Sequence, residues 1–216
     1  MMKNFNNDIL KTYSIIKPEI EKRIAEFKKI REKATDKELF HELVFCIMTP
    51  QSKAKSCGKA LEILIEYNLI FNGTAEEISE KINIVRFRNN KAKYIVEARG
   101  KFTQGKYFKM RDILYSQGDV HKIREWLVKN IKGIGYKEAS HFLRNTGFGD
   151  EIAILDRHIL KNMILSGILS EKPKTLSPAT YLLIEKKLID FSKKIQIPPD
   201  HLDFVWWYKE AGEVYK

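Results

Sequence analysis

The sequence predicts an all-helical protein, and three observations carry this prediction. Apolar residues recur at three- and four-residue spacing in five stretches: LFHELVFCIM (39–48), ALEILIEY (60–67), IREWLVKNI (123–131), YLLIEKKLIDF (181–191) and HLDFVWWY (201–208). The strict alternation of apolar and polar residues that is typical of a half-buried strand is nearly absent. Turn and capping residues separate the periodic stretches, as short connections between helices require.

The helix boundaries can be placed in order from local signals. Asn72 and Gly73 form a turn, after which Thr74 and Glu77 make a capping box for the next helix. Later boundaries use the same chemistry, with a helix end at Gly118 and helix starts at Asp119, at Ser177 with Pro178, and at Pro198 with Pro199. About ten helices result. No flexible linker or internal repeat divides the chain, so we expect one compact unit over residues 1–216 with two helical lobes and a cleft between them.

Composition narrows the class of protein. The chain has 216 residues and 44% hydrophobic residues, without an apolar run long enough to cross a membrane or a secretion signal at the N-terminus. We therefore expect a cytoplasmic protein. Cys46 and Cys57 match no zinc or redox spacing and are expected to be free thiols. The net charge of +11 attracts polyanions, which favours nucleic acid as the partner. The alternative is that the lysine-rich composition, and with it the charge, reflects only codon bias or a hot habitat.

The segment 128–160 carries the chemistry. Gly133, Ile134 and Gly135 allow a tight hairpin between two helices, in which Ile134 fills the apolar gap and outward-facing backbone amides bind a DNA phosphate. An ordinary turn between helices is the alternative. Lys137 falls in the first turn of the second helix, where the positive end of the helix dipole disfavours a cation. That position favours the neutral, nucleophilic amine, whereas a solvated lysine is the simpler interpretation.

Asp156 lies nineteen positions after Lys137, just before the stretch that begins with Arg157. Its residue type and place predict an N-cap for the helix that follows. A carboxylate can both cap a helix and stabilise a nearby cation, so the structural and the catalytic interpretation are compatible.

The two motifs together resemble the helix-hairpin-helix superfamily of DNA glycosylases. The resemblance rests on the hairpin IKGIGYKEA (131–139), within a motif of about 122–146, and on LDRH (155–158). It extends to CIMTPQSKA (46–54) and VRFRNNKA (85–92), and it is strongest to the compact 8-oxoguanine DNA glycosylases of archaea and thermophilic bacteria. Two cysteines cannot build the four-cysteine iron-sulfur cluster of other branches.

The resemblance implies a bifunctional base-excision enzyme acting on double-stranded DNA. Lys137 would be the nucleophile at C1′ of a flipped-out nucleotide, and Asp156 would stabilise the positive charge that develops on the sugar. The resulting Schiff base would break the strand by β-elimination without a metal or organic cofactor. The backbone carbonyls of Lys129, Ile131 and Ile134 would hold a structural Na⁺ or K⁺ at the hairpin.

The residue types and the resemblance together indicate which residues contact DNA. Phe87, Trp207 and Lys216 would recognise the base; Trp206 and Trp207 cannot both face it, because adjacent helix positions point in different directions, and Trp206 is expected in the core. Gln51, expected at the start of a helix after Pro50, would enter the space left by the base or pair with its orphaned partner. A solvent-facing residue in the first turn is the alternative. Further DNA contacts are expected from the hairpin residues 133–135 and from Arg86, Arg88 and His158, with Lys91 and Lys93 in the same basic cluster.

Three other functions fit parts of the pattern. A non-catalytic helix-hairpin-helix module would bind DNA without cleaving it, and an endonuclease III-like enzyme would excise oxidised pyrimidines instead of 8-oxoguanine. An alkylation-damage glycosylase fits less well, because that chemistry does not require an amine nucleophile. One duplex needs one enzyme molecule, so we expect a monomer.

Overall fold

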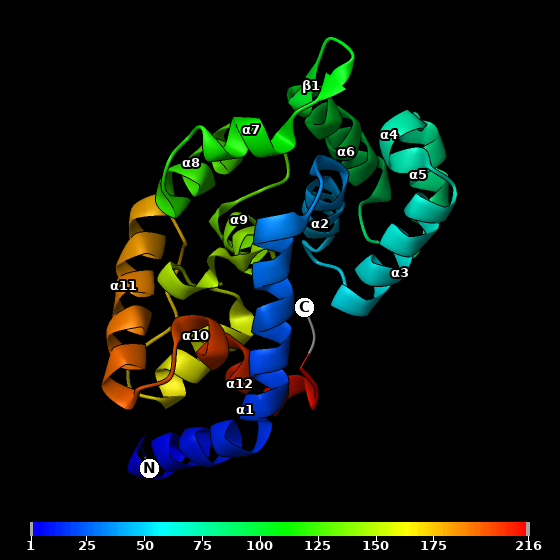
Figure 1. Cartoon of the computed structure of the whole chain (residues 1–216). Coiled ribbons are helices and arrows are strands. Elements are labelled where there is room, and N and C mark those ends of the chain that lie inside the picture. The colour runs from blue at the N-terminus through cyan, green and yellow to red at the C-terminus, as the bar shows by residue number, and fades with distance from the viewer. Residues whose placement is uncertain (1, 215–216) are drawn as a thin grey trace.

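The computed structural model describes residues 2–214 and is mostly helical (Figure 1). The helices in this part of the chain are α1 (Met2–Lys33), α2 (Asp36–Met48), α3 (Ala54–Glu66), α4 (Leu69–Asn72), α5 (Ala75–Lys81), α6 (Arg88–Phe102), α7 (Met110–Tyr115), α8 (Val120–Asn130), α9 (Tyr136–Leu143), α10 (Arg157–Leu165), α11 (Pro178–Ile195) and α12 (Pro199–Ala211). A π turn (Arg144–Phe148) and a 3-10 turn (Gly149–Glu151) follow α9. The all-helical prediction is confirmed.

A small hairpin is the exception to the helical fold. Strands β1 (Thr103–Gln104) and β2 (Tyr107–Phe108) pair antiparallel, with Thr103 opposite Phe108. Two residues per strand are too few to give the alternating pattern by which strands are found in a sequence. The described helices number twelve instead of about ten, in part because α4 has only four residues.

Local signals placed three of the helix starts correctly. Thr74 and Glu77 form the expected capping box of α5, and the Asp119 side chain accepts a hydrogen bond from the Lys122 amide at the start of α8. The Ser177 side chain caps α11, which begins with Pro178. Each of these bonds spans three residues, so the sequence alone contains the information needed to find it.

The described residues form two hydrophobic clusters. One is built mainly by α2 to α9 around buried rings such as Phe40, Phe45 and Phe142. The other is built by α1 and α10 to α12 around Tyr181 and Trp206. Trp206 is completely buried, which confirms its expected place in the core.

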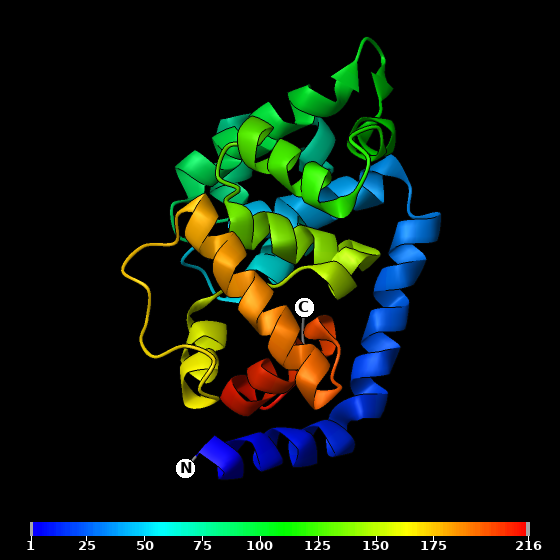
Figure 2. The same cartoon turned by 90° about the vertical axis from the view of Figure 1, so that its left-hand side faces the viewer.

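Helix α11 connects the two clusters. Its buried apolar residues belong to the second cluster, and Figure 2 shows it running from the region of α8 towards α12. Glu185 of α11 forms a two-point ion pair with Arg124 of α8, with Nη1 to Oε1 at 2.5 Å and Nη2 to Oε2 at 2.8 Å. Both side chains are excluded from solvent, so the pair is a fixed link between the clusters. Within the described chain, no helix combines the length and apolarity needed to span a membrane.

Candidate active site at two helix N-termini

The predicted hairpin joins α8 to α9 and requires glycine at one position. Gly133 has φ +80°, and a Cβ added there would lie 2.5 Å from Cδ2 of Tyr94. Both the backbone conformation and the close approach of the tyrosine ring therefore exclude a side chain. Ile134 is 6% exposed and packs in the first cluster, as expected for the residue that fills the gap between the helices.

Two of the three hairpin amides have hydrogen-bond partners within the protein. The Ile134 amide donates to the Ile131 carbonyl at 3.4 Å, and the Gly135 amide donates to Oε2 of Glu138 at 3.3 Å. Of the three predicted phosphate-binding amides, only that of Gly133 has no hydrogen-bond partner within residues 2–214. Glu138 was missed as a cap, although it stands three residues after Gly135, which is the usual spacing of a capping box.

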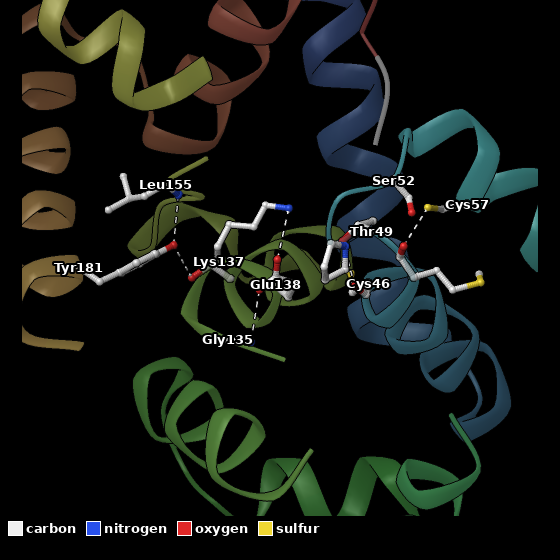
Figure 3. A network of polar contacts seen from close by, with 12 residues as sticks. Cys46, Thr49, Ser52, Cys57, Gly135, Lys137, Glu138, Leu155 and Tyr181 are labelled. Carbon is white, nitrogen blue, oxygen red and sulfur yellow. Dashed lines mark hydrogen bonds and ion pairs between the residues drawn. The ribbon is translucent and has the colours of Figure 1, made fainter. Parts of the chain in front are cut away.

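Lys137 is the second residue of α9, as predicted. Its side chain is 27% exposed, and Nζ lies 3.7 Å from Oε1 of Glu138. The amine is thus near the positive end of the helix dipole and beside a carboxylate. Figure 3 shows the Lys137 side chain extending away from α9 rather than lying along it.

Asp156 caps α10, as predicted. Its Oδ1 accepts hydrogen bonds from the amides of His158 and Ile159, each at 2.8 Å. Both bonds use the same oxygen, and Oδ2 accepts none from the described residues. The cap therefore orients the carboxylate and leaves one oxygen for a substrate.

Asp203 places the lysine and the aspartate in one electrostatic neighbourhood. Burial on α12 raises the pKa of the Asp203 carboxyl to about 6; nearby Arg144 lowers it, Asp156 raises it and Lys137 lowers it. Both predicted catalytic charges thus act on the same carboxyl group. Arg144 lies closest, with Nη1 3.5 Å from Oδ2 of Asp203. Asp203 was not among the predicted site residues, although a charged residue within the apolar stretch 201–208 was a signal for it.

A buried hydroxyl ties the segment before Asp156 to the helix of Lys137. The Tyr181 hydroxyl donates to the Ala153 carbonyl at 2.6 Å and accepts from the Leu155 amide at 3.1 Å. It also lies 3.3 Å from Oγ of Ser140, one turn after Lys137 (Figure 3). Burial raises the pKa of Tyr181, so the hydroxyl stays protonated and can donate. No local sequence pattern predicts these contacts, because the partners are far apart in the sequence.

The predicted base-recognition residues lie on different elements. Phe87 is 55% exposed and precedes α6 with φ +58°. Trp207 is partly buried, and its ring meets the ring of His158 edge to face, with the centroids 5.3 Å apart. Nδ1 of His158 lies 3.5 Å from Oε2 of Glu210. Lys216 lies outside the described residues.

Two predictions about the basic and polar residues need correction. Gln51 is not in the first turn of a helix: α3 begins at Ala54, and Gln51 is exposed in the preceding turn with φ +55°. Lys91 is not part of a solvated basic cluster, because it is 4% exposed and its ammonium bonds to protein oxygens. Arg86 and Arg88 are exposed, as phosphate contacts would have to be.

The carbonyls named for a monovalent cation suit such an ion. Lys129 belongs to the last turn of α8, where helix carbonyls lack the amides of a next turn. Ile131 follows this end, and its carbonyl accepts a long hydrogen bond of 3.4 Å from the Ile134 amide. The negative end of the α8 dipole points in the same direction. Hard oxygen donors at a helix C-terminus match the chemistry of Na⁺ or K⁺. Among the described residues, no group of three or more histidine, cysteine or acidic side chains is arranged to hold a metal ion.

Comparisons with known proteins show similarity over most or all of the chain to one family. The model of a family described as "Ogg-HhH: 8-oxoguanine DNA glycosylase" matches residues 20–197. The 8-oxoguanine DNA glycosylase/AP lyase of Fusobacterium nucleatum is 49% identical over 217 residues, covering all of both chains. The enzyme of that name from Methanocaldococcus jannaschii is 41% identical over 205 residues, or 94% of each chain.

Two solved structures superpose on the whole chain. One is the 8-oxoguanine DNA glycosylase of Thermotoga maritima, with a TM-score of 0.88 at 35% identity. The other is the Methanocaldococcus jannaschii 8-oxoguanine glycosylase/lyase in complex with a 15mer DNA containing 8-oxoguanine, with a TM-score of 0.89 at 38% identity. Each superposition covers 100% of both chains.

Proposed function

Because the chain belongs to the 8-oxoguanine DNA glycosylase family, we propose that it excises 8-oxoguanine from double-stranded DNA and then cleaves the strand 3′ to the abasic site. The observation that carries this proposal is the pairing of two helix N-termini: Lys137 in the first turn of α9 and Asp156 as the cap of α10. One supplies an amine and the other a carboxylate with a free oxygen, which are the two groups that the reaction needs.

Lys137 is proposed as the nucleophile. Its neutral amine attacks C1′ while the bond from C1′ to the base breaks, and the base leaves with the bonding electrons and a proton. Opening of the sugar ring converts the new bond to a Schiff base. Loss of a proton from C2′ then expels the 3′ phosphate.

Asp156 is proposed to stabilise the sugar as it becomes cationic. The charge on C1′ and the ring oxygen develops only in the transition state, so a fixed carboxylate next to it lowers the barrier. The two amides bonded to Oδ1 hold the group in place without moving during the reaction. Oδ2 is the oxygen that faces the sugar in this proposal.

The remaining contacts divide between base and backbone. Phe87, Trp207 and Lys216 are proposed to recognise the extruded base, and Gln51 to occupy the space it leaves. The hairpin 133–135 and the side chains of Arg86, Arg88 and His158 are proposed to bind phosphates. A Na⁺ or K⁺ held by the carbonyls of Lys129, Ile131 and Ile134 would supply positive charge to a phosphate, and the chemistry itself needs no cofactor. The enzyme acts as a monomer, and its substrate places it with the chromosomal DNA of the cytoplasm.

Borohydride trapping tests the proposal. Wild type, Lys137→Gln and the control Lys122→Gln, which changes an exposed lysine of α8, are incubated with a duplex containing 8-oxoguanine opposite cytosine. Wild type and the control should form a covalent adduct, and Lys137→Gln should form none. Binding without an adduct or cleavage by wild type, also on a duplex with an abasic site, would identify a DNA-binding module. Cleavage at oxidised pyrimidines but not at 8-oxoguanine would identify an endonuclease III-like enzyme.

A further inference from the structure

Two exposed residues on separate loops have a left-handed backbone. Gln51 follows α2 with φ +55°, and Phe87 precedes α6 with φ +58°. For residues other than glycine this conformation costs about 1 to 2 kcal/mol. It persists only where the surrounding structure enforces it, and such positions cluster at functional sites. The exposed side chains contribute little packing that could offset the cost, so the cause has to lie beneath the loops.

One buried ammonium group lies beneath the first loop. Nζ of Lys91 donates hydrogen bonds to the carbonyls of Met48 at 2.6 Å and Pro50 at 2.7 Å, and to Oγ of Ser52 at 3.0 Å. These three bonds use all three protons of the group. They hold the carbonyl at the end of α2 and both flanks of Gln51, which fixes the turn.

The same network reaches the second loop through Ser52. Its Oγ also accepts the backbone amide of Arg86 at 3.1 Å, one residue before Phe87. Lys91 lies in α6, which begins directly after Phe87, so its backbone fixes the far side of that loop. One lysine and one serine therefore constrain both left-handed residues at once.

The network is also close to the predicted nucleophile. Burial lowers the pKa of Lys91, and among the charged groups acting on it are Glu138, which raises it, and Lys137, which lowers it. In the view of Figure 3 the turn with Thr49 and Ser52 faces the Lys137 side chain. The network thus lies in the electrostatic neighbourhood of Lys137, the residue that has to reach the extruded nucleotide.

We propose that Lys91 is a positioning residue. It holds Gln51 in the conformation in which it fills the space left by the damaged base, and Phe87 in the conformation in which it contacts the extruded base. This inference rests on the proposed function, because it assigns a step of base extrusion. Lys91 acts through the two loops and touches neither the sugar nor the base. Removing its ammonium group therefore weakens extrusion and leaves the chemistry at Lys137 intact.

The test separates extrusion from chemistry in three variants. Lys91→Met keeps the stem and removes the ammonium group; Ser52→Ala keeps the bonds of Lys91 to both carbonyls and breaks the bridge to Arg86. Lys101→Met removes an exposed lysine from the same helix as a control. Extrusion is followed by the fluorescence of 2-aminopurine next to 8-oxoguanine in a duplex. Chemistry is followed by cleavage at an abasic site in a single-stranded oligonucleotide, which has no base pair to open.

Lys91→Met is expected to slow extrusion and excision from the duplex about tenfold to a hundredfold, as a misplaced side chain at a site does. Cleavage of the single-stranded abasic site should stay within about twofold of wild type. Ser52→Ala should show a smaller effect of the same kind, and it decides the question if Lys91→Met does not fold. Lys101→Met should match wild type in both assays.

A double-mutant cycle excludes a merely structural role. In a Gln51→Ala, Phe87→Ala background, Lys91→Met should add almost nothing to the loss of extrusion, because its effect passes through those two side chains. The inference would be overturned if the effect of Lys91→Met multiplied with that of the Gln51→Ala, Phe87→Ala background. It would also be overturned if Lys91→Met lowered extrusion and abasic-site cleavage equally, or left extrusion unchanged. Failure of wild type to excise 8-oxoguanine or to cleave the abasic site would instead overturn the proposed function.

Discussion

The two helix ends that carry Lys137 and Asp156 differ from the two loops that carry Gln51 and Phe87. At the helix ends, capping bonds place the catalytic groups in ordinary backbone conformations. At the loops, a network buried below them holds the backbone of two exposed residues in the left-handed conformation. The reacting groups are thus positioned by unstrained local structure. The side chains proposed to contact the DNA bases are positioned by a strained backbone that the buried network enforces. We therefore expect that a substitution at a helix end can lower activity without changing stability. A substitution at a loop should raise stability while it lowers activity.

The largest effect is expected at the cap of α10. Asp156→Asn should lower the single-turnover excision rate about 10²- to 10³-fold, because it removes charge that stabilises the transition state. Asparagine caps helices as well as aspartate, so the free energy of unfolding should change by less than about 0.5 kcal/mol. Excision kinetics and urea unfolding measure the two quantities. The control Asp119→Asn alters the equivalent cap of α8; if it loses as much activity, the effect belongs to capping and not to the charge.

The next effect is a dependence of stability on pH through Asp203. Its pKa is raised by burial to about 6 in the folded protein, so folding favours the protonated form. The contribution of this group to stability is therefore fully present below about pH 4 and is lost as the pH rises through about 6, by about 3 kcal/mol. Asp203→Asn should remove this dependence. Urea unfolding at pH 4.5 and 7 measures it against Asp190→Asn, an exposed control on α11; equal slopes for both variants would contradict the prediction.

A smaller loss is expected when the hydroxyl that joins the two catalytic segments is removed. Tyr181→Phe leaves the Ala153 carbonyl and the Leu155 amide without their partner, which should cost about 1 to 3 kcal/mol of unfolding free energy. Because Leu155 precedes Asp156, excision should slow as well, by about tenfold. Thermal unfolding and single-turnover kinetics test this together. Tyr107→Phe, at an exposed tyrosine, should change neither, and an unaffected excision rate in Tyr181→Phe would show that Asp156 is held by its cap alone.

The smallest effect, and the one with the opposite sign, is expected at the loops. Gln51→Gly relieves the left-handed strain and should stabilise the protein by up to about 1 kcal/mol while it lowers excision. The same change at Gln196, which has φ +56° at the end of α11, should stabilise the protein without loss of activity. Thermal unfolding and excision assays distinguish these outcomes. Destabilisation by Gln51→Gly would mean that the loop is not strained.

The same contrast explains what the sequence could predict. The caps at Thr74, Asp119 and Asp156 depend on residues two or three positions away, so their residue types and spacing are sufficient to place them. The lysine after the hairpin was found for the same reason. By contrast, the bond from Lys91 to Met48 spans 43 positions. Lys91 looked like one more surface cation, because only the packing of α6 against α2 shows that its ammonium is buried.

The backbone position of Gln51 and the role of Tyr181 could not be predicted from the sequence, for related reasons. Pro50 suggested a helix start at Gln51, but the carbonyls of this turn are held by a lysine from another helix, and α3 begins three residues later. Tyr181 fitted the apolar face of its own helix, and its hydroxyl gained a role only when residues 153–155 were folded against it. Residues with local partners were therefore predictable, and those with distant polar partners required the structure.

The ion pair between Arg124 and Glu185 has a consequence for how the enzyme admits its substrate. It joins α8 to α11 across the boundary between the two hydrophobic clusters, and separating them would leave two buried charges unpaired, at a cost of about 3 to 5 kcal/mol. A hinge opening along this boundary is therefore expected to be rare. We expect the two clusters to unfold in a single calorimetric transition, and the bending and unpairing that bring a nucleotide to Lys137 to occur in the DNA rather than in the protein.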